Sequence, residues 1–329
     1  MKIGIIGSGM RAFMVLDAIN DIEGISCAAI WSRKQDKINT IELEEKYHVR
    51  TIHTEIDEFL KDKTFDVVYV AVINHLHYQF AKQALEYGKH VICEKPFTTT
   101  VAEAEELVKI AKNKHKLIFE SVMLRYSDNY DAVKENIHNL GNMKLIQFNF
   151  SQYSRRFDSY KSGIVLPVFD PKYSGGCLYD LTVYCVHFIN GIFGYPKEIA
   201  YYANKGFNGI DTSGSLILDY GNFKAVCNVA KDSTSPSFCI LQGDEGYMKI
   251  DSKPGNVKNV AMILRNGESK LLDKTGVSEN PLVDVFLKIR KMKHENDYEN
   301  CYKMIDASVE VMRILENARK YAKITFGVD

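Results

Sequence analysis

The architecture of the first third of this chain follows from one stretch near its start, Lys2-Ile3-Gly4-Ile5-Ile6-Gly7-Ser8-Gly9-Met10-Arg11-Ala12. Residues 2–6 form an apolar run that is typical of a strand buried on both faces. A turn with two glycines follows, and residues 13–20 then place apolar side chains at helical spacing. A strand, a glycine-rich turn and a helix in this order predict the first βα unit of a parallel sheet.

The glycine-rich turn has the pattern Gly-x-Gly-x-x-Ala. Gly7 permits the tight turn, Gly9 lets the backbone approach a pyrophosphate, and Ala12 allows the helix and the strand to pack closely. The N–H groups of the helix N-terminus favour an anion at the same place. An ordinary glycine turn is the alternative, but the position between a strand and a helix favours a dinucleotide site. Its predicted residues are Gly7, Ser8, Gly9, Met10, Arg11 and Ala12.

The rest of the first 121 residues continues the alternation of strands and helices. Further strands are predicted at 26–31, 66–72, 90–93 and 117–119, and further helices at 35–47, 78–87 and 101–114. This alternation implies an α/β domain over residues 1–121, with a doubly wound parallel sheet and right-handed crossovers.

After Ser121 the pattern changes to strands that follow one another without helices between them. A helix over 128–139 precedes them, and the predicted strands are 144–153, 198–204, 213–220, 224–229, 237–242, 247–250 and 260–264. Such a series predicts a second domain over 122–329 with an antiparallel or mixed sheet. An apolar stripe predicts a C-terminal helix over 300–323, which is a candidate to pack back on the first domain.

Composition argues against several classes of function. Lys and Arg number 42, as do Asp and Glu, and this balance argues against nucleic-acid binding and against attraction to an anionic membrane. Seven scattered cysteines without a Cys-x-x-Cys pair favour free thiols in a reducing compartment. The first apolar run is too short for a signal peptide and no later one approaches a membrane span, so the expected location is the cytoplasm.

The end of the second predicted strand bears on the choice of cofactor. NAD enzymes commonly place an Asp or Glu there to hold the ribose 2′-hydroxyl, whereas Ser32, Arg33 and Lys34 follow Trp31 here. A hydroxyl and a guanidinium suit a 2′-phosphate. The sequence therefore favours NADP over NAD, with Ser32 and Arg33 at that phosphate, although a solvated turn with two incidental cations is the alternative.

Two further segments carry side chains suited to chemistry on a substrate. Glu94-Lys95-Pro96 closes a strand whose C-terminal end should open onto the ligand crevice, and a surface lysine in a turn is an equally good explanation of the spacing. If Gly175-Gly176 open a helix, then Asp180, Tyr184 and His187 share one face. A carboxylate, a phenol and an imidazole in one stripe suggest an acid/base array, while spacing alone favours a solvated polar stripe.

In their order along the chain these motifs resemble those of the Gfo/Idh/MocA oxidoreductases. They are Gly7–Ala12, Asn74-His75-Leu76-His77, Glu94-Lys95-Pro96 and the segment from Gly175 to Tyr184. The resemblance covers nearly the whole chain and implies a Rossmann domain followed by an α/β domain with a large, open-faced, mainly antiparallel sheet. One departure is Val72-Ile73 before Asn74, where the family often has Thr-Pro.

The resemblance also implies roles for individual residues. It makes Lys95 catalytic and lets Asp180 and Tyr184 complete the site, and it places Asn74, His77, Glu94 and Lys95 on the side of the cofactor. Tyr rather than His at position 184 is more similar to the dihydrodiol dehydrogenase and glucose-fructose oxidoreductase branch than to the inositol dehydrogenases. The missing acid after the second strand points to the same branch.

The expected activity is hydride transfer between a nicotinamide and a small hydroxylated substrate, such as a sugar, a diol or a related carbonyl compound. Tyr184 would take the hydroxyl proton, Lys95 would favour the phenolate and bind the substrate oxygen, and Asp180 would orient the substrate or balance the charge of Lys95. An NAD-dependent inositol or aminosugar dehydrogenase is the nearest alternative. A non-catalytic dinucleotide-binding sensor is another, and the acid/base set argues against it.

Other polar groups and the oligomeric state are less constrained. The His75-x-His77 spacing suggests a metal, but no third ligand lies nearby in the sequence, so no metal is expected. Arg125, Tyr153, Arg155 and Arg156 are candidates to contact the substrate and fit an exposed strand face equally well. An open sheet must bury its apolar face, which predicts a homodimer through that sheet, with a tetramer as the alternative.

Overall fold

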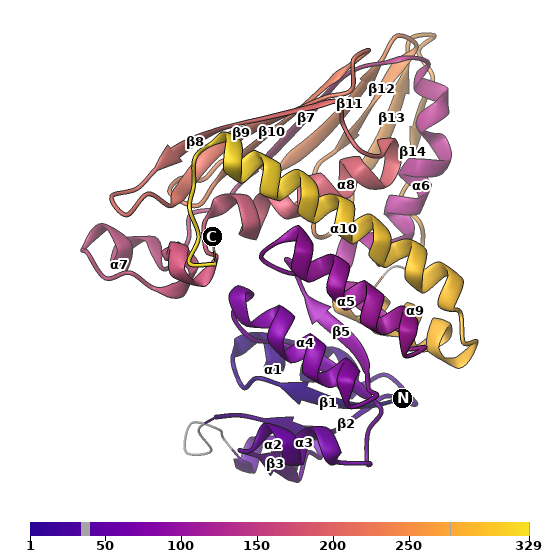
Figure 1. Cartoon of the computed structure of the whole chain (residues 1–329). Coiled ribbons are helices and arrows are strands. Elements are labelled where there is room, and N and C mark those ends of the chain that lie inside the picture. The colour runs from indigo at the N-terminus through magenta and orange to yellow at the C-terminus, as the bar shows by residue number, and fades with distance from the viewer. Residues whose placement is uncertain (34–39, 277, 329) are drawn as a thin grey trace. The chain divides into compact units, whose positions relative to one another are not determined.

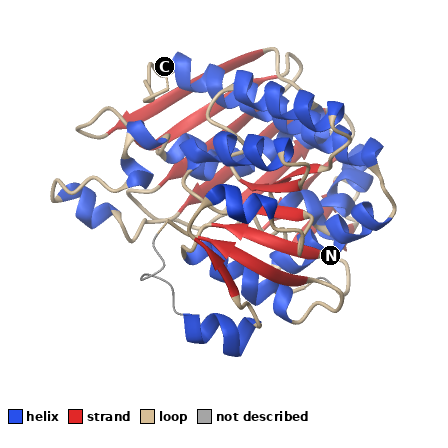
Figure 2. Ribbon diagram, turned by 60° about the horizontal axis from the view of Figure 1, so that its bottom comes forward, coloured by secondary structure: helices blue, strands red, loops and turns tan. Residues whose placement is uncertain are grey.

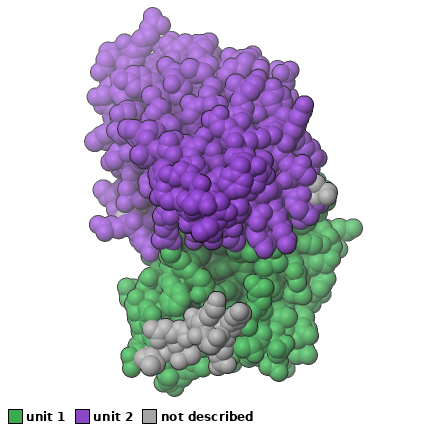
Figure 3. Space-filling view, turned by 90° about the vertical axis from the view of Figure 1, so that its left-hand side faces the viewer, with its two compact units in different colours: residues 1–121, 282–309 green, residues 122–281, 310–329 purple. Residues whose placement is uncertain are grey.

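A computed structural model of the chain describes residues 1–33, 40–276 and 278–328 (Figure 1). The chain divides into two compact units, and Figure 3 shows them in different colours. The first unit comprises residues 1–121 and 282–309, and the second comprises 122–281 and 310–329. The sequence predicts one division, after residue 121. In the structure the chain returns to the first unit at residues 282–309 before it ends in the second.

The first unit contains a six-stranded parallel sheet in the order β3-β2-β1-β4-β5-β6. Figure 2 draws the strands of the chain in red. Its strands are β1 (Lys2–Ile6), β2 (Ser26–Trp31), β3 (Thr51–His53), β4 (Val67–Val70), β5 (His90–Glu94) and β6 (Ile118–Ser121). The order reverses between β1 and β4, as it does in a doubly wound Rossmann sheet, and this confirms the predicted fold class. In such a sheet ligands bind outside the carboxyl ends of the strands at the reversal point.

Helices of the first unit agree with the sequence pattern where their apolar periodicity is long. The predicted ones are α1 (Met10–Asn20), α2 (Thr40–Tyr47), α4 (His77–Glu86), α5 (Val101–Asn113) and the first part of α10 (Tyr298–Tyr321). The unit also contains α3 (Ile56–Lys61) and most of α9 (Pro281–His294), which the sequence pattern did not predict. The predicted helix over 35–47 is described from residue 40, and its residues 35–39 lie outside the described residues. The start of α5 is fixed by a capping box, because Thr100 accepts from the Glu103 amide and Glu103 accepts from the Thr100 amide.

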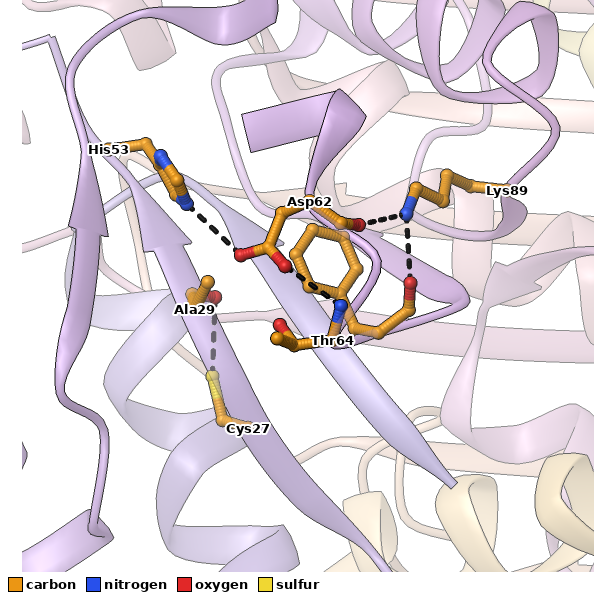
Figure 4. Close-up of polar contacts among 7 residues, drawn as sticks. Cys27, Ala29, His53, Asp62, Thr64 and Lys89 are labelled. Carbon is orange, nitrogen blue, oxygen red and sulfur yellow. Dashed lines mark hydrogen bonds and ion pairs between the residues drawn. The ribbon is translucent and has the colours of Figure 1, made fainter. Parts of the chain in front are cut away.

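Non-local polar contacts hold the short elements β3 and α3, which the sequence pattern did not predict (Figure 4). His53 Nε2 lies 3.2 Å from a carboxylate oxygen of Asp62, and the Thr64 amide donates to the other oxygen at 2.8 Å. Lys89 donates to the carbonyl oxygens of Asp62 and Phe65, and burial lowers the pKa of this lysine. The loop that leads into β4 is therefore fixed by a residue more than twenty positions later in the chain.

The second unit contains an eight-stranded sheet in the order β14-β13-β12-β11-β7-β10-β9-β8. Its strands are β7 (Met143–Ser151), β8 (Glu198–Lys205), β9 (Asp211–Asp219), β10 (Lys224–Ala230), β11 (Phe238–Gly243), β12 (Gly246–Ile250), β13 (Val260–Leu264) and β14 (Ser269–Leu271). β7 and β10 pair in parallel, and the other described neighbours pair antiparallel. The prediction of a mixed, mainly antiparallel second sheet is thus confirmed.

The two faces of this sheet differ in burial. On β7, the side chains of Ile146, Phe148 and Phe150 are buried, whereas the alternate residues keep part of their surface exposed. One row across the second face contains Ile217, Val226 and Ile240, each half-buried. The α-helices that the structure describes in this unit are α6 (Asp128–Asn136), α7 (Phe157–Lys161), α8 (Val183–Phe193) and the second part of α10 (Tyr298–Tyr321).

A π-helix over Leu178–Thr182 precedes α8. The hypothesis of a polar stripe assumed that Gly175-Gly176 open a regular helix, and the wider π-turn instead changes the phase between Asp180 and the residues that follow. The stripe of Asp180, Tyr184 and His187 at strict i, i+4 and i+7 spacing does not describe this segment.

Within the described residues, no helix combines the length and the apolar character needed to cross a bilayer.

Candidate functional site

The glycine-rich turn between β1 and α1 is built for close approach of the backbone. Gly7 has φ +120°, and a Cβ on it would collide with the carbonyl oxygen of Ala71. Gly9 is the N-cap of α1, and no described atom lies within 4 Å of the position that its Cβ would take. No acidic side chain lies in the first turn of this fully described helix. The turn and the helix N-terminus therefore fit the pyrophosphate of a dinucleotide.

Arg11 and Glu94 connect this turn to the end of β5. Arg11 Nε donates to Glu94 Oε1 at 2.5 Å, and the hydroxyl of Tyr69 donates to the same oxygen. Tyr69 also lies 3.0 Å from Ser121 Oγ. Burial raises the pKa of Tyr69 well above its ordinary value, and the charge of Glu94 adds to this effect. Arg11 and Glu94, both predicted to contact the cofactor, thus bind each other. Their bond connects the glycine-rich turn to the loop after β5.

The residues after β2 differ in exposure. Ser32 is buried, and its hydroxyl lies 2.8 Å from that of Ser8 in the glycine-rich turn. Arg33 is exposed, and Lys34 lies outside the described residues. Ser32 therefore links the two loops, and Arg33 is the described cation at the place where a 2′-phosphate is expected.

The loops after β4 and β5 are joined by His77. This side chain is buried, with Nδ1 2.7 Å from the carbonyl oxygen of Pro96 and Nε2 3.1 Å from that of Val72. Burial lowers the pKa of His77. Both ring nitrogens therefore face main-chain carbonyls, an arrangement that the sequence did not predict. Asn74 and Lys95 lie on these adjacent loops, and each keeps part of its surface exposed.

Asp211 fixes the start of the π-helix in the second unit. One of its carboxylate oxygens accepts from the Leu178 amide at 2.6 Å and from the hydroxyl of Tyr201 at 2.8 Å. Gly176 has φ +98°, and a Cβ on it would collide with the same carboxylate. Burial raises the pKa of Asp211, and the two hydrogen bonds oppose that rise. The sequence pattern gave no sign of Asp211, because this residue begins β9 and reaches the π-helix from a distant part of the chain.

Asp180, in the middle of the π-helix, forms an ion pair with Lys231, the residue after β10. The Lys231 side chain is 3% exposed and that of Asp180 is 32% exposed. Tyr184 is buried, with its ring 6.2 Å from that of Phe150, and His187 is fully buried. Sequence reasoning missed Lys231, although a lysine directly after a strand was the signal that identified Lys95.

The remaining candidates lie at the surface or partly below it. Tyr153 is exposed and donates to Asp158 at 2.7 Å, Arg155 and Arg156 are exposed, and Arg125 is half-buried. No group of three or more His, Cys, Asp or Glu side chains arranged to hold a metal occurs among the described residues.

Comparison with known proteins gives several full-length matches. A family model described as an oxidoreductase family with an NAD-binding Rossmann fold, GFO_IDH_MocA, matches residues 1–121. The scyllo-inositol 2-dehydrogenase (NADP(+)) of Bacillus subtilis is 30% identical and covers 100% of this chain and 99% of its own length. The trans-1,2-dihydrobenzene-1,2-diol dehydrogenase of Xenopus tropicalis is 25% identical and covers 83% and 81%.

Among solved structures, a 3-ketoreductase from Actinomadura kijaniata in complex with NADP and TDP-benzene has a TM-score of 0.84. It is 18% identical and covers 97% of both chains, so this likeness shows the fold alone. The relatives include a dihydrodiol dehydrogenase, as the sequence motifs suggested, and an inositol dehydrogenase whose identity is higher.

Proposed function

The chain belongs to the Gfo/Idh/MocA family of NAD(P)-dependent oxidoreductases, and from that premise we propose that it transfers hydride between NADP and a small polyhydroxylated substrate. The observation that carries the proposal is the full-length likeness to an NADP(+)-dependent scyllo-inositol dehydrogenase. Because that relative acts on a cyclitol, scyllo-inositol is the first substrate to test. Sugars and diols come next, since dihydrodiol dehydrogenases are also relatives.

The end of β2 supports NADP as the cofactor. Trp31, Ser32 and Arg33 include no acid that would hold a ribose 2′-hydroxyl and repel a 2′-phosphate. Gly7 and Gly9 would hold the pyrophosphate at the start of α1, and Arg33 would bind the 2′-phosphate through its planar N–H groups. When bound, the nicotinamide supplies or accepts the hydride.

Three side chains are proposed to act on the substrate. Tyr184 takes the proton from the substrate hydroxyl during oxidation and returns it during reduction. Lys95 donates a hydrogen bond to the same oxygen, and its charge favours the phenolate form of Tyr184. Asp180 accepts a hydrogen bond from a neighbouring substrate hydroxyl and thereby orients the ring. A protein that only sensed the dinucleotide would not need this acid/base set.

We propose that the partner is a second copy of this chain. The half-buried row of Ile217, Val226 and Ile240 lies on the face of the eight-stranded sheet that carries fewer buried side chains. Two such faces are self-complementary, as an isologous dimer requires.

The experiment is a titration of the purified protein with NADPH and with NADH, followed by the fluorescence of Trp31. This residue is the single tryptophan of the chain and is buried at the end of β2. Tighter binding of NADPH, weakened at least about tenfold by Arg33→Ala with little change for NADH, supports the proposal. Preferred binding of NADH would contradict the choice of cofactor. Turnover is then measured with NADP+ and scyllo-inositol, followed by a panel of polyols and diols.

A further inference from the structure

We infer that Lys231 is a positioning residue that acts through Asp180, an inference that rests on the function proposed above. The two side chains form an ion pair in the second unit, and neither the motifs nor the family pattern assigned Lys231 a role. The inference is that this lysine holds the Asp180 carboxylate in the orientation needed to bind a substrate hydroxyl.

The ammonium of Lys231 is fixed by its surroundings before it meets Asp180. Its side chain is 3% exposed, and Nζ lies 5.2 Å from the centre of the Phe169 ring. The Lys231 amide donates to Thr212 at 2.8 Å, and its carbonyl oxygen accepts from Ser154 at 2.8 Å. Because the backbone is held on both sides, the sheet rather than a surface loop sets the position of the charge.

Burial of this ammonium is costly unless a carboxylate compensates it. Removing a lysine charge from water carries a penalty of several kcal/mol, which attraction to a well-placed anion offsets. Asp180 supplies that anion, and the charge of Lys231 also opposes part of the rise that burial gives the pKa of the more distant Asp211. A buried ion pair that served no site could be replaced as a pair by apolar residues at little cost, because buried ion pairs add little net stability.

The partner of the lysine is not buried to the same degree. Asp180 keeps 32% of its side-chain surface exposed, ten times the fraction of Lys231. The asymmetry places the lysine behind the carboxylate and leaves the exposed side of Asp180 toward a ligand. This is how a supporting residue locks a residue that touches substrate.

The π-helix gives a reason why Asp180 needs such support. Each hydrogen bond of a π-helix spans five residues, one more than in an α-helix. Such turns are frequent at functional sites. Asp211 fixes the start of this turn through Leu178, and Lys231 fixes its middle through Asp180. A displacement of about 1 Å in a substrate-binding group can lower the rate by roughly a hundredfold.

The test is a double-mutant cycle on turnover, using Lys231→Met, Asp180→Asn and the double variant in the full-length enzyme. The probe is scyllo-inositol with NADP+. We expect Lys231→Met to lower kcat/KM for the polyol about 10–100-fold while the Kd for NADPH, read from Trp31 fluorescence, stays within about twofold. In the Asp180→Asn background the same change should have almost no further effect, because the group it acts through is already altered.

Lys224→Met is the matched control. Lys224 lies at the start of β10, the strand that Lys231 follows, and pairs with Asp219 in a partly exposed ion pair. It should leave kcat/KM unchanged. If Lys231→Met impairs folding, Lys231→Gln keeps a hydrogen-bond donor without the charge and takes its place in the cycle, with the folded fraction measured by urea unfolding.

Losses that multiply in the double variant would overturn the inference, because Lys231 would then act independently of Asp180. The inference would also be overturned if the loss of kcat/KM disappeared once activity was divided by the folded fraction. The ion pair would then be structural only. If the enzyme turns over another polyol of the panel but not scyllo-inositol, the substrate proposed above is wrong, and the same cycle on that polyol decides the inference. If it turns over none, the proposed function and the inference both fail.

Discussion

The guanidinium of Arg11 donates to the carboxylate of Glu94 at 2.5 Å, across 83 positions of sequence. This bond joins the first turn of α1 to the last residue of β5, so the glycine-rich turn and the loop of Lys95 depend on each other. Glu94 is nearly buried, with 7% of its side chain exposed, and it also accepts from Tyr69. The ion pair of Arg11 and Glu94 therefore connects two of the loops predicted to bind the cofactor.

Arg11→Met should lower the free energy of unfolding by about 3 kcal/mol, because it leaves the Glu94 carboxylate without its counter-charge. The double variant Arg11→Met with Glu94→Gln should lose less, since the uncompensated charge is gone. Urea unfolding followed by Trp31 fluorescence measures both. A double variant that is less stable than Arg11→Met would contradict this account.

Gly7→Ala and Gly9→Ala should separate folding from cofactor binding. Gly7 has φ +120° and faces the carbonyl oxygen of Ala71, so alanine there should cost about 2 kcal/mol or more. Gly9 has extended φ and ψ angles, and alanine at this N-cap should cost about 1 kcal/mol. Its methyl group nevertheless fills the space proposed for the pyrophosphate, so NADPH affinity should fall at least about tenfold. Full affinity in a stably folded Gly9→Ala protein would place the pyrophosphate elsewhere.

Tyr184→Phe should reduce kcat by about 10²–10⁴-fold, the range expected when a general acid or base is removed. The Kd for NADPH should change little, because the phenol is proposed to act on the substrate. Tyr247→Phe, at an exposed position on β12, is the control and should leave kcat unchanged. Comparable losses of kcat and of NADPH affinity would exclude the role assigned to Tyr184.

His90 should make the protein less stable in acid. Burial, followed by repulsion from Lys116 and Lys293, lowers the pKa of His90 to about 4. The unfolded chain accepts a proton on this residue below about pH 6.5 and the folded chain does not, so the unfolding free energy falls as pH falls from about 6.5 to 4. Allowing for partial solvent screening, the loss should be about 2 kcal/mol.

The measurement for His90 is urea unfolding at a series of pH values, with His90→Asn as the comparison. The Leu117 amide donates to His90 Nδ1 at 2.9 Å, and the asparagine oxygen can accept that bond without titrating. The variant should therefore show a shallower dependence on pH in this window. Parallel curves for the two proteins would show that another group is responsible.

Ile240→Glu should convert the proposed dimer to a monomer. Ile240 is half-buried on β11 in the row with Val226 and Ile217, and a carboxylate there would be buried without a partner in an interface. Light scattering after size exclusion measures the mass. Leu287→Glu, which alters an exposed apolar residue on α9, should leave the mass unchanged. A wild-type protein that is already monomeric would refute the proposed partner.

The helices and strands could be predicted from the sequence wherever the pattern of apolar residues extended over enough positions to identify the element. The strand of residues 260–264 and the helix from residue 101 begin where the pattern placed them, because an apolar run and apolar residues at helical spacing are local signals. β3 has three residues, and its position depends on His53, Asp62 and Lys89, which meet only in the folded chain. No window of sequence contains that information.

The candidate site divides in the same way. Gly7 and Lys95 could be identified because each follows a strand within a recognisable motif. Lys231 and Asp211 could not, because each acts on the π-helix from a different strand of the sheet. The phase of Asp180 could not be predicted either, since nothing in the local pattern signals one additional residue in a helical turn.

The interleaving of the two units along the chain has a consequence for how the protein is made. Phe286 packs 5.7 Å from Tyr69, and Cys301 contacts the carbonyl oxygen of Ile118, so the core of the first unit includes residues that are translated after the whole of the eight-stranded sheet. The second unit likewise takes in residues 310–329. Domains of many proteins fold one after another during synthesis, the N-terminal one first. Here the parallel sheet of residues 1–121 lacks the covering of residues 282–309 until the eight-stranded sheet of the second unit has been translated, so the first unit cannot complete its core first.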